Sequence, residues 1–307
     1  MMTGSIIKIE GLSHRYTTQW AVRDINMEIS HNGIYGLLGS NGAGKSTLMN
    51  ILCGVLRQTT GSVLIQNEDI CKNPEIVKRH IGFLPQKPPL HPDLTVEEYL
   101  TYCAKLHYVE PKDLSRAISA VLERCRISHF RKRLLRNLSG GYQQRVGIAQ
   151  AIIHNPDFVV LDEPTNGLDP TQIIDVRYLI KEIAEEHTVL LSTHILSEVQ
   201  AICQYIYMIE KGRMVFNGTI NDFDNYIVPT TLMVRLCANP SVEELCVIPN
   251  VLSINPLGDS RYRLQFSDIQ EAIEQIVELS VSQNWELEEI YPERESLDTV
   301  FAELSKK

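Results

Sequence analysis

Between residues 39 and 47 the chain reads Gly39-Ser40-Asn41-Gly42-Ala43-Gly44-Lys45-Ser46-Thr47, a full match to the pattern G-x-x-x-x-G-K-[ST]. The apolar run 34–38 precedes this stretch, as a short buried strand would. Leu48, Ile51 and Leu52 follow it at the spacing of one helix face. The order of strand, glycine-rich loop and helix predicts a phosphate-binding loop.

This loop carries the groups that a polyphosphate needs. Its glycines let successive backbone N–H groups turn toward the phosphates, and the following helix adds the positive end of its dipole. We expect Lys45 to reach the β- and γ-phosphates, and the Ser46 hydroxyl to bind Mg²⁺.

A second apolar run ends in two carboxylates. Residues 158–161 are entirely apolar, and Asp162 and Glu163 follow at once. A buried strand would deliver both side chains rigidly to the edge of the sheet beside the phosphate loop. We expect Asp162 to hold Mg²⁺ through water, and Glu163 to orient and deprotonate the attacking water. The two motifs together predict a P-loop nucleoside triphosphatase.

A third motif lies between these two and reads Leu138-Ser139-Gly140-Gly141-Tyr142-Gln143-Gln144-Arg145. Its Ser-Gly-Gly at a helix start would make a second anion site. In this motif the chain resembles the ABC ATPase family, whose signature motif it matches. The resemblance implies that the signature binds the γ-phosphate of ATP held by the opposite subunit, through Ser139, Gly140, Gly141 and Gln143.

The resemblance extends to three further polar residues. Gln86 resembles the glutamine that touches Mg²⁺ and relays to the membrane partner. Asp169 resembles the aspartate of the D-loop, which crosses the dimer interface. His194 resembles the switch histidine that contacts the γ-phosphate, and it follows Glu163 by one predicted helix and one strand.

The family also implies an aromatic side chain that stacks on adenine. Tyr16 is our candidate, because stacking requires only a π-face, and Trp20 is the competing aromatic. No catalytic position departs from the family pattern. Two copies of the chain are therefore expected to form two equivalent active sites.

The pattern of strands and helices agrees with this resemblance. Apolar strands that alternate with helices predict an α/β fold with a mostly parallel sheet covered on both faces. The alternating stretches 6–10 and 25–29 predict an antiparallel N-terminal β part. The block from about 90 to 155 reads as an inserted helical subdomain, which a capping box of Thr95 and Glu98 opens.

Charge divides the 307 residues into two parts. The whole chain has a net charge of −9, which argues against a nucleic-acid binder. Residues 1–221 hold 23 basic and 22 acidic residues, whereas residues 222–307 hold 6 and 16. We therefore expect an ABC ATPase domain over residues 1–221 and an accessory domain over residues 222–307.

The accessory domain is predicted to be small and of the α+β class. Strands are expected at 232–236, 251–255, 262–266 and 285–290, with helices at 268–283 and 297–304. The ending 295–301, read as E-S-L-D-T-V-F, resembles the S-L-E-x-V-F ending of export-type ABC ATPases. That subgroup includes ATPases of drug-export, sodium-export and gliding-motility systems.

These resemblances imply an ATP- and Mg²⁺-dependent transport ATPase that pairs with a second copy or a paralogue. Its membrane subunits would be encoded separately, because no run of the chain reaches the roughly 20 apolar residues of a spanning helix. The expected location is the cytoplasmic face of the membrane. The alternative is a soluble ABC ATPase that acts on ribosomes or DNA, and the C-terminal domain could also act as a sensor that gates hydrolysis.

Overall fold

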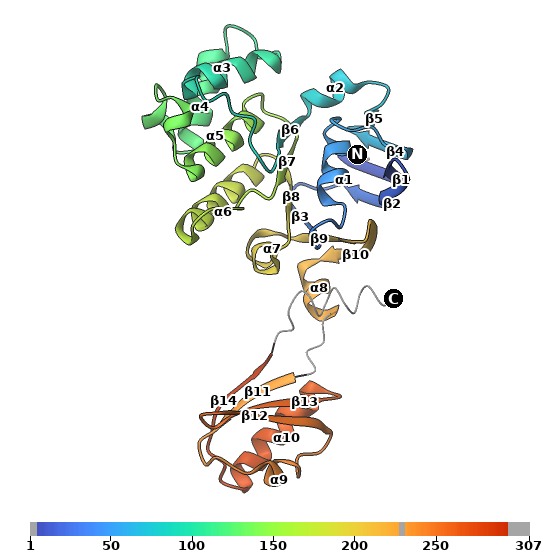
Figure 1. Cartoon of the computed structure of the whole chain (residues 1–307), viewed down its shortest axis with the longest axis vertical. Helices are drawn as coiled ribbons and strands as arrows, with labels where there is room; N and C mark the ends of the chain where they lie inside the picture. The colour runs from blue at the N-terminus through green and yellow to red at the C-terminus, as the bar shows by residue number, and fades with distance from the viewer. Residues whose placement is uncertain (1–4, 227–230, 294–307) are drawn as a thin grey trace. The chain divides into compact units, whose positions relative to one another are not determined.

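The computed structural model describes residues 5–226 and 231–293. The chain divides into two compact units, one up to Ile220 and the other from Asn221 onward (Figure 1). No described helix combines the length and the apolar character that crossing a membrane would require.

A six-stranded sheet forms the centre of the first unit. Its order is β10-β9-β3-β8-β7-β6, and every neighbouring pair is parallel except β10 with β9. Every residue of β3, β7 and β8 is buried, as expected for a sheet covered on both faces. The predicted parallel core is confirmed. The strand bounds are β3 Ile34–Leu38, β6 Ile81–Leu84, β7 Phe158–Asp162, β8 Thr188–Thr193, β9 Tyr205–Glu210 and β10 Arg213–Thr219.

A second, antiparallel sheet carries the N-terminal strands in the order β2-β1-β4-β5. One hydrophobic core joins it to the central sheet through the apolar side of α1, with Leu48 and Ile51 fully buried. The phosphate-loop helix is thus held between two sheets. The bounds are β1 Ile7–Tyr16, β2 Gln19–Ile29, β4 Thr60–Ile65, β5 Glu68–Asp69 and α1 Lys45–Leu52.

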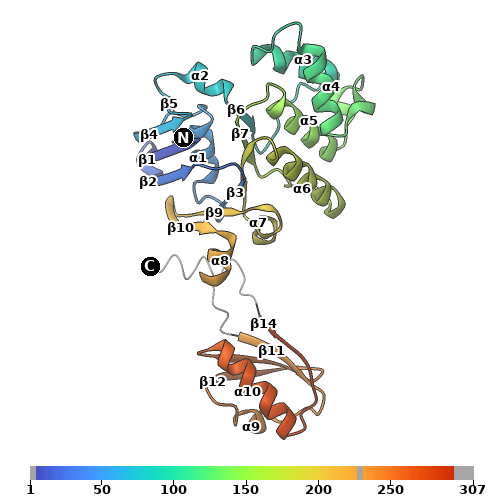
Figure 2. The ribbon, with the colours of Figure 1, turned by 180° about the vertical axis from the view of Figure 1, so that it is seen from behind.

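Helices α3, α4, α5 and α6 lie across the central sheet from α1, whereas α2 lies on the same side as α1 (Figures 1 and 2). Helices α3, α4 and α5 pack on one another and form the predicted helical block. Thr95 and Glu98 make the predicted capping box at the start of α3. The bounds are α2 Pro74–Arg79, α3 Val96–Leu106, α4 Leu114–Arg124, α5 Gly140–Ile152, α6 Pro170–Ala184, α7 Leu196–Ile202 and α8 Ile220–Tyr226.

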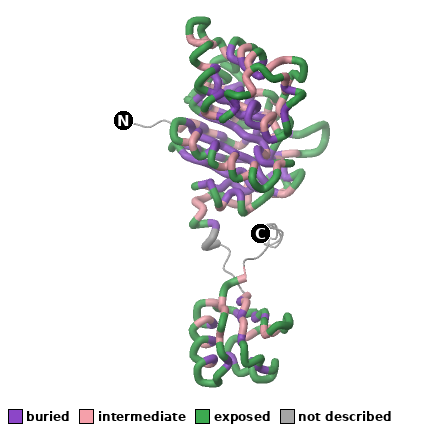
Figure 3. The backbone as a smooth tube through the Cα atoms, turned by 90° about the vertical axis from the view of Figure 1, so that its left-hand side faces the viewer, coloured by how far each residue is buried: buried purple, intermediate pink, exposed green. Residues whose placement is uncertain are grey.

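The second unit packs α10 on an antiparallel sheet of order β12-β13-β11-β14. In Figure 3 its buried residues lie along the interior of this small unit. Helix α9 is absent from the sequence prediction. The predicted terminal helix 297–304 and the ending 295–301 lie outside the described residues. The bounds are β11 Thr231–Leu236, α9 Val242–Leu245, β12 Val251–Gly258, β13 Arg261–Phe266, α10 Ile269–Ser282 and β14 Leu287–Pro292.

Candidate functional site

The loop between β3 and α1 has a backbone that only glycine permits at two points. A Cβ at Gly39 would lie 2.4 Å from the carbonyl oxygen of Ile209. Gly44 has a φ of 110°, and its Cβ would lie 2.6 Å from the carbonyl oxygen of Ala21. Any side chain at either position would force neighbouring backbone apart. The glycines of the motif therefore set the close packing of this loop.

Lys45, the first residue of α1, turns back over the loop. Its side chain is largely buried, and Nζ donates to the carbonyl oxygens of Gly39 at 2.8 Å and Ser40 at 3.0 Å. Burial lowers the pKa of Lys45, whereas the nearby carboxylates of Glu163 and Asp162 act to raise it. A cation is thus held at the loop, on carbonyl partners that an anionic phosphate could replace.

A cavity of about 540 Å³ opens beside this loop. The β9–β10 turn supports the loop, because Gly212 N donates to Ala43 O at 2.9 Å. Asn41 is exposed at the loop tip. The cavity wall includes Tyr16, Trp20, Gly42, Lys45, Ser46, Thr47 and Lys211. Its size and its mixture of aromatic, cationic and hydroxyl groups suit a nucleotide.

The two candidate aromatics of this cavity differ in their surroundings. Tyr16 is 51% exposed, and its ring meets the His14 ring edge-on with centroids 4.8 Å apart. Trp20 has the guanidinium carbons of Arg15 and Arg23 at 5.6 and 5.9 Å from its ring centroid. Both distances lie within cation–π range, so the faces of Trp20 are partly engaged.

Glu163 is the meeting point of the predicted catalytic residues. Its carboxylate accepts hydrogen bonds from Gln86 Nε2 at 2.8 Å and Asn166 Nδ2 at 3.1 Å, and His194 Nδ1 lies 3.2 Å away. Its φ of 48° falls in the left-handed region, which costs energy for a residue with a side chain. Strands β6, β7 and β8 therefore bring Gln86, Glu163 and His194 to one point.

Asp162 ends β7 in a buried position. Ser192 Oγ, on neighbouring β8, donates to Asp162 Oδ1 at 2.5 Å and accepts from Glu163 N at 3.0 Å. The predicted Mg²⁺ ligands, Ser46, Gln86 and Asp162, offer the oxygen donors that this ion prefers. Within the described parts of the chain no three His, Cys, Asp or Glu residues cluster as a metal site. The donor set fits an ion that keeps water and phosphate oxygens as its other ligands.

The signature residues lie at the N-terminus of α5. Ser139 is the N-cap, and its side chain makes no capping hydrogen bond. Gln143 Nε2 donates to Leu135 O at 3.1 Å, and a Cβ at Gly141 would meet the side chain of Gln172. Helix α5 lies across the sheet from α1 in both views (Figures 1 and 2), and no signature residue lines the cavity beside the phosphate loop. Within one chain, the signature motif therefore does not lie beside the phosphate loop.

Asp169, the predicted D-loop residue, is the N-cap of α6. Its carboxylate accepts from Gln172 N at 2.9 Å. This bond satisfies one of the backbone donors that a helix start leaves open. The residue thus has a structural contact within its own chain.

Comparison with known proteins places the chain in a family. A family model described as ABC transporter matches residues 22–166. BcrA of Bacillus licheniformis, a bacitracin transport ATP-binding protein, is 38% identical over 69% of this chain and 69% of its own length. YdbJ of Bacillus subtilis, an uncharacterised ABC transporter ATP-binding protein, is 32% identical over 98% of this chain and 95% of its own length. The chain belongs to the ATP-binding subunits of ABC transporters.

Solved structures of ABC cassettes agree with this assignment. The cassette MJ0796, in a dimeric post-hydrolysis state bound to ADP and Pi, superposes with a TM-score of 0.64 at 25% identity. The match covers 70% of this chain and 98% of that one. The predicted α/β P-loop fold is confirmed, and the chain is an ABC ATPase.

Some groups around the site of this ABC ATPase were missed from the sequence. Asn166 and Ser192 bind Glu163 and Asp162 directly, and Gln144 Nε2 donates to Pro164 O at 2.8 Å. Small polar residues beside carboxylates are common, so the sequence carried no signal for Ser192. Gln144 lies within the signature motif, but the family pattern assigns the phosphate contacts to other residues of that motif.

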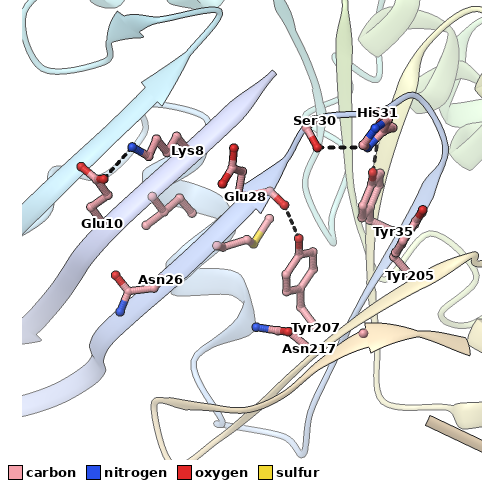
Figure 4. Close-up of a pocket in the computed structure, with 13 residues that line it drawn as sticks. Lys8, Glu10, Asn26, Glu28, Ser30, His31, Tyr35, Tyr205, Tyr207 and Asn217 are labelled. Atoms are coloured by element: carbon pink, nitrogen blue, oxygen red, sulfur yellow. Dashed lines mark hydrogen bonds and ion pairs between the residues drawn. The ribbon is translucent and has the colours of Figure 1, made fainter. Parts of the chain in front are cut away.

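A second cavity, of about 630 Å³, lies between β1–β2 and β9–β10 (Figure 4). None of the predicted site residues lines it. Its polar groups bind one another: Lys8 pairs with Glu10 at 2.7 Å, and Tyr207 donates to the backbone carbonyl of Glu28 at 2.5 Å. The Tyr35 and Tyr205 rings stack beside them with centroids 4.9 Å apart. The bond from Tyr207 in β9 to Glu28 in β2 joins the two sheets of the ABC ATPase unit.

Proposed function

We propose that two copies of this chain, or this chain and a paralogue, close around two ATP molecules to drive separately encoded membrane subunits, in the direction of export. The observation that carries the proposal is that the predicted site residues lie in two separate places on one chain. Lys45 and Glu163 lie at one face of a single chain, whereas Ser139 and its motif lie elsewhere. A second chain would supply the missing signature to each phosphate loop.

The residues divide the work of hydrolysis among them. Lys45 and the backbone N–H groups of residues 39–47 bind the β- and γ-phosphates, and Tyr16 stacks on adenine. Glu163 takes a proton from the attacking water while Gln86 and His194 hold its carboxylate in place. Ser46, Gln86 and Asp162 would hold Mg²⁺, which would supply positive charge to the phosphates during the reaction.

The two-domain organisation is part of this proposal. Residues 1–221 form the ABC ATPase domain, and residues 222–307 form an accessory domain that meets other subunits. The relative YdbJ aligns along nearly the whole chain, which supports a shared two-domain plan. The resemblance of the ending 295–301 to export-type subunits supports the direction, and the membrane partners would hold the chain at the inner face of the membrane.

Mixing two inactive variants tests the shared site. Lys45→Ala removes the phosphate-binding cation, and Ser139→Glu places a carboxylate where the proposal expects a γ-phosphate. Ser128→Glu, an equally exposed change in the same helical region, is the matched control. A heterodimer of Lys45→Ala with Ser139→Glu retains one intact phosphate loop facing one intact signature.

We expect each of the two variants alone to release little phosphate. Random mixing makes roughly half of the dimers heterodimers, and each heterodimer has one intact site. The mixture should therefore recover up to roughly half of the activity that one intact site per dimer would give. The Ser128→Glu control should remain active. Recovery would show that the signature acts across subunits. A mixture as inactive as its components, in dimers shown to exchange subunits, would contradict the proposal.

Co-purification in detergent distinguishes transport from the alternative. A tagged full chain should recover a protein with membrane spans from native membranes, and that interaction should survive nuclease treatment. Recovery of ribosomes or DNA in place of a membrane protein would favour a soluble ABC ATPase.

A further inference from the structure

Glu198 is a buried carboxylate that the mechanism above does not use. It lies in α7, four residues after His194, and it is 3% exposed. Placing a carboxylate in such a position is costly unless several donors compensate it. Its contacts show which segments provide that compensation.

Two threonine hydroxyls donate to the two oxygens of Glu198. Thr165 Oγ1 donates to Oε1 at 2.5 Å, and Thr193 Oγ1 donates to Oε2 at 2.7 Å. Thr165 stands two residues after Glu163, and Thr193 stands immediately before His194. One carboxylate therefore spans the two segments that present Glu163 and His194 to each other.

A third contact reaches the helix that follows Asp169. Arg177 Nη2, on α6, lies 3.8 Å from Glu198 Oε1. Arg177 Nε is buried and has no hydrogen-bond partner among the described residues, so this guanidinium depends on the nearby carboxylate for compensation. The D-loop helix is thus linked to the same buried group.

We propose that Glu198 is a positioning residue for ATP hydrolysis, which fixes the loop of Glu163 against the loop of His194. This inference rests on the proposed roles of those two residues. Glu198 does not line the cavity beside the phosphate loop. Its loss should let the Glu163–His194 contact drift, which lowers turnover without weakening ATP binding.

Strand β8 offers a matched pair of substitutions. Thr193→Val removes the hydroxyl bound to Glu198, at the end of the strand. Thr188→Val, at its start, removes another buried hydroxyl, which donates to Asn32 Oδ1 at 3.0 Å. Both changes replace a buried threonine by a residue of the same shape, so their structural costs should be similar. They differ in that the Thr193 hydroxyl donates to Glu198 and also accepts from Ile195 N at 3.0 Å, beside His194. Glu198→Gln keeps the Thr193 hydroxyl, so it separates the bond to Glu198 from the bond to Ile195 N.

The experiment measures kcat and KM of phosphate release, ATP affinity and thermal stability for the full chain and its variants. We expect Thr193→Val and Glu198→Gln to lower kcat about tenfold with KM and ATP affinity nearly unchanged. Glu198→Ala should lower kcat further, so that glutamine gives partial rescue. Thr188→Val should lose comparable stability while kcat stays normal.

Three results decide the matter. If Thr193→Val keeps normal kcat, or if Thr188→Val lowers kcat equally, Glu198 has only a structural role. If Glu163→Gln stops turnover while both Glu198 variants remain active, this inference alone fails. If the wild-type chain releases no phosphate in any assembly, the proposed function fails instead.

Discussion

Glu163 and His194 meet through Oε1 and Nδ1 at 3.2 Å, although they stand at the ends of different strands. The parallel pairing of β7 with β8 brings these strand ends together. Ser192, in β8 and two residues before His194, bonds to both Asp162 and Glu163. Several donors hold this carboxylate in place, and its side chain remains 11% exposed. The central sheet thereby builds the catalytic end of the site.

Removing the cation of the phosphate loop should weaken ATP binding itself. Lys45→Ala deletes a buried ammonium whose hydrogen bonds to a charged ligand each contribute about 1.5–3 kcal/mol, so we expect affinity to fall roughly tenfold to a hundredfold. Titration calorimetry with ATP checks this. Lys112→Ala, at an exposed lysine, serves as the control. Unchanged affinity in Lys45→Ala would contradict the role assigned to the loop.

The two aromatics beside the cavity can be separated by substitution. Base stacking on an aromatic side chain contributes about 1–3 kcal/mol, so Tyr16→Ala should weaken ATP and ADP binding by about tenfold or more. Tyr16→Phe keeps the π-face and should bind normally. Trp20→Ala should have a smaller effect, because Arg15 and Arg23 already engage that ring. A larger loss for Trp20→Ala would transfer the stacking role to Trp20.

Acid should destabilise the first unit through a stacked histidine pair. The ring centroids of His107 and His154 lie 3.7 Å apart. Burial is the main cause that lowers the pKa of His154 to about 3, and the charge of His107 is the second. An unfolded histidine takes up its proton near pH 6.5, so the unfolded chain binds more protons between about pH 6.5 and 3. The free energy of unfolding should therefore fall as the pH drops through this window.

One proton of difference gives a slope of at most about 1.4 kcal/mol per pH unit. Urea denaturation at a series of pH values measures this slope. His154→Gln should reduce it, because the neutral side chain no longer titrates. The same slope in wild type and variant would rule out His154 as its source.

The second unit should unfold separately when its core is damaged. Phe266 is 1% exposed and packs in a core made only of residues from that unit. Phe266→Ala should cost about 3–5 kcal/mol of that unit's stability, while ATP affinity stays unchanged. Calorimetry should then resolve a transition at lower temperature. A uniform shift of a single transition, with weaker ATP binding, would indicate that the units fold as one.

Local sequence patterns predicted the elements that position the site. The apolar runs at β3 and β7 and the capping box at Thr95 have short-range causes, which a single sequence displays. Helix α9 was not predicted, because its four residues are too few to show a helical repeat of apolar side chains.

Side-chain partnerships were harder to foresee. Ser192, Thr193 and Glu198 acquire their roles only when β8 and α7 are placed against β7 and its following loop. Nothing in their sequence spacing specifies which carboxylate a hydroxyl will meet. Glu163 was predicted from an apolar strand that ends in two carboxylates, whereas Gln86 and His194 were marked by the family pattern. The structure places all three in contact.

The most direct test of this account is phosphate release by Glu163→Gln. The variant keeps the shape of the side chain and its contacts with Gln86 and His194, but it cannot accept a proton from water. We predict that turnover falls by at least about a hundredfold while ATP affinity changes little, as for loss of a general base. Turnover close to that of the wild type would contradict the central claim that Glu163 drives hydrolysis in this ABC ATPase.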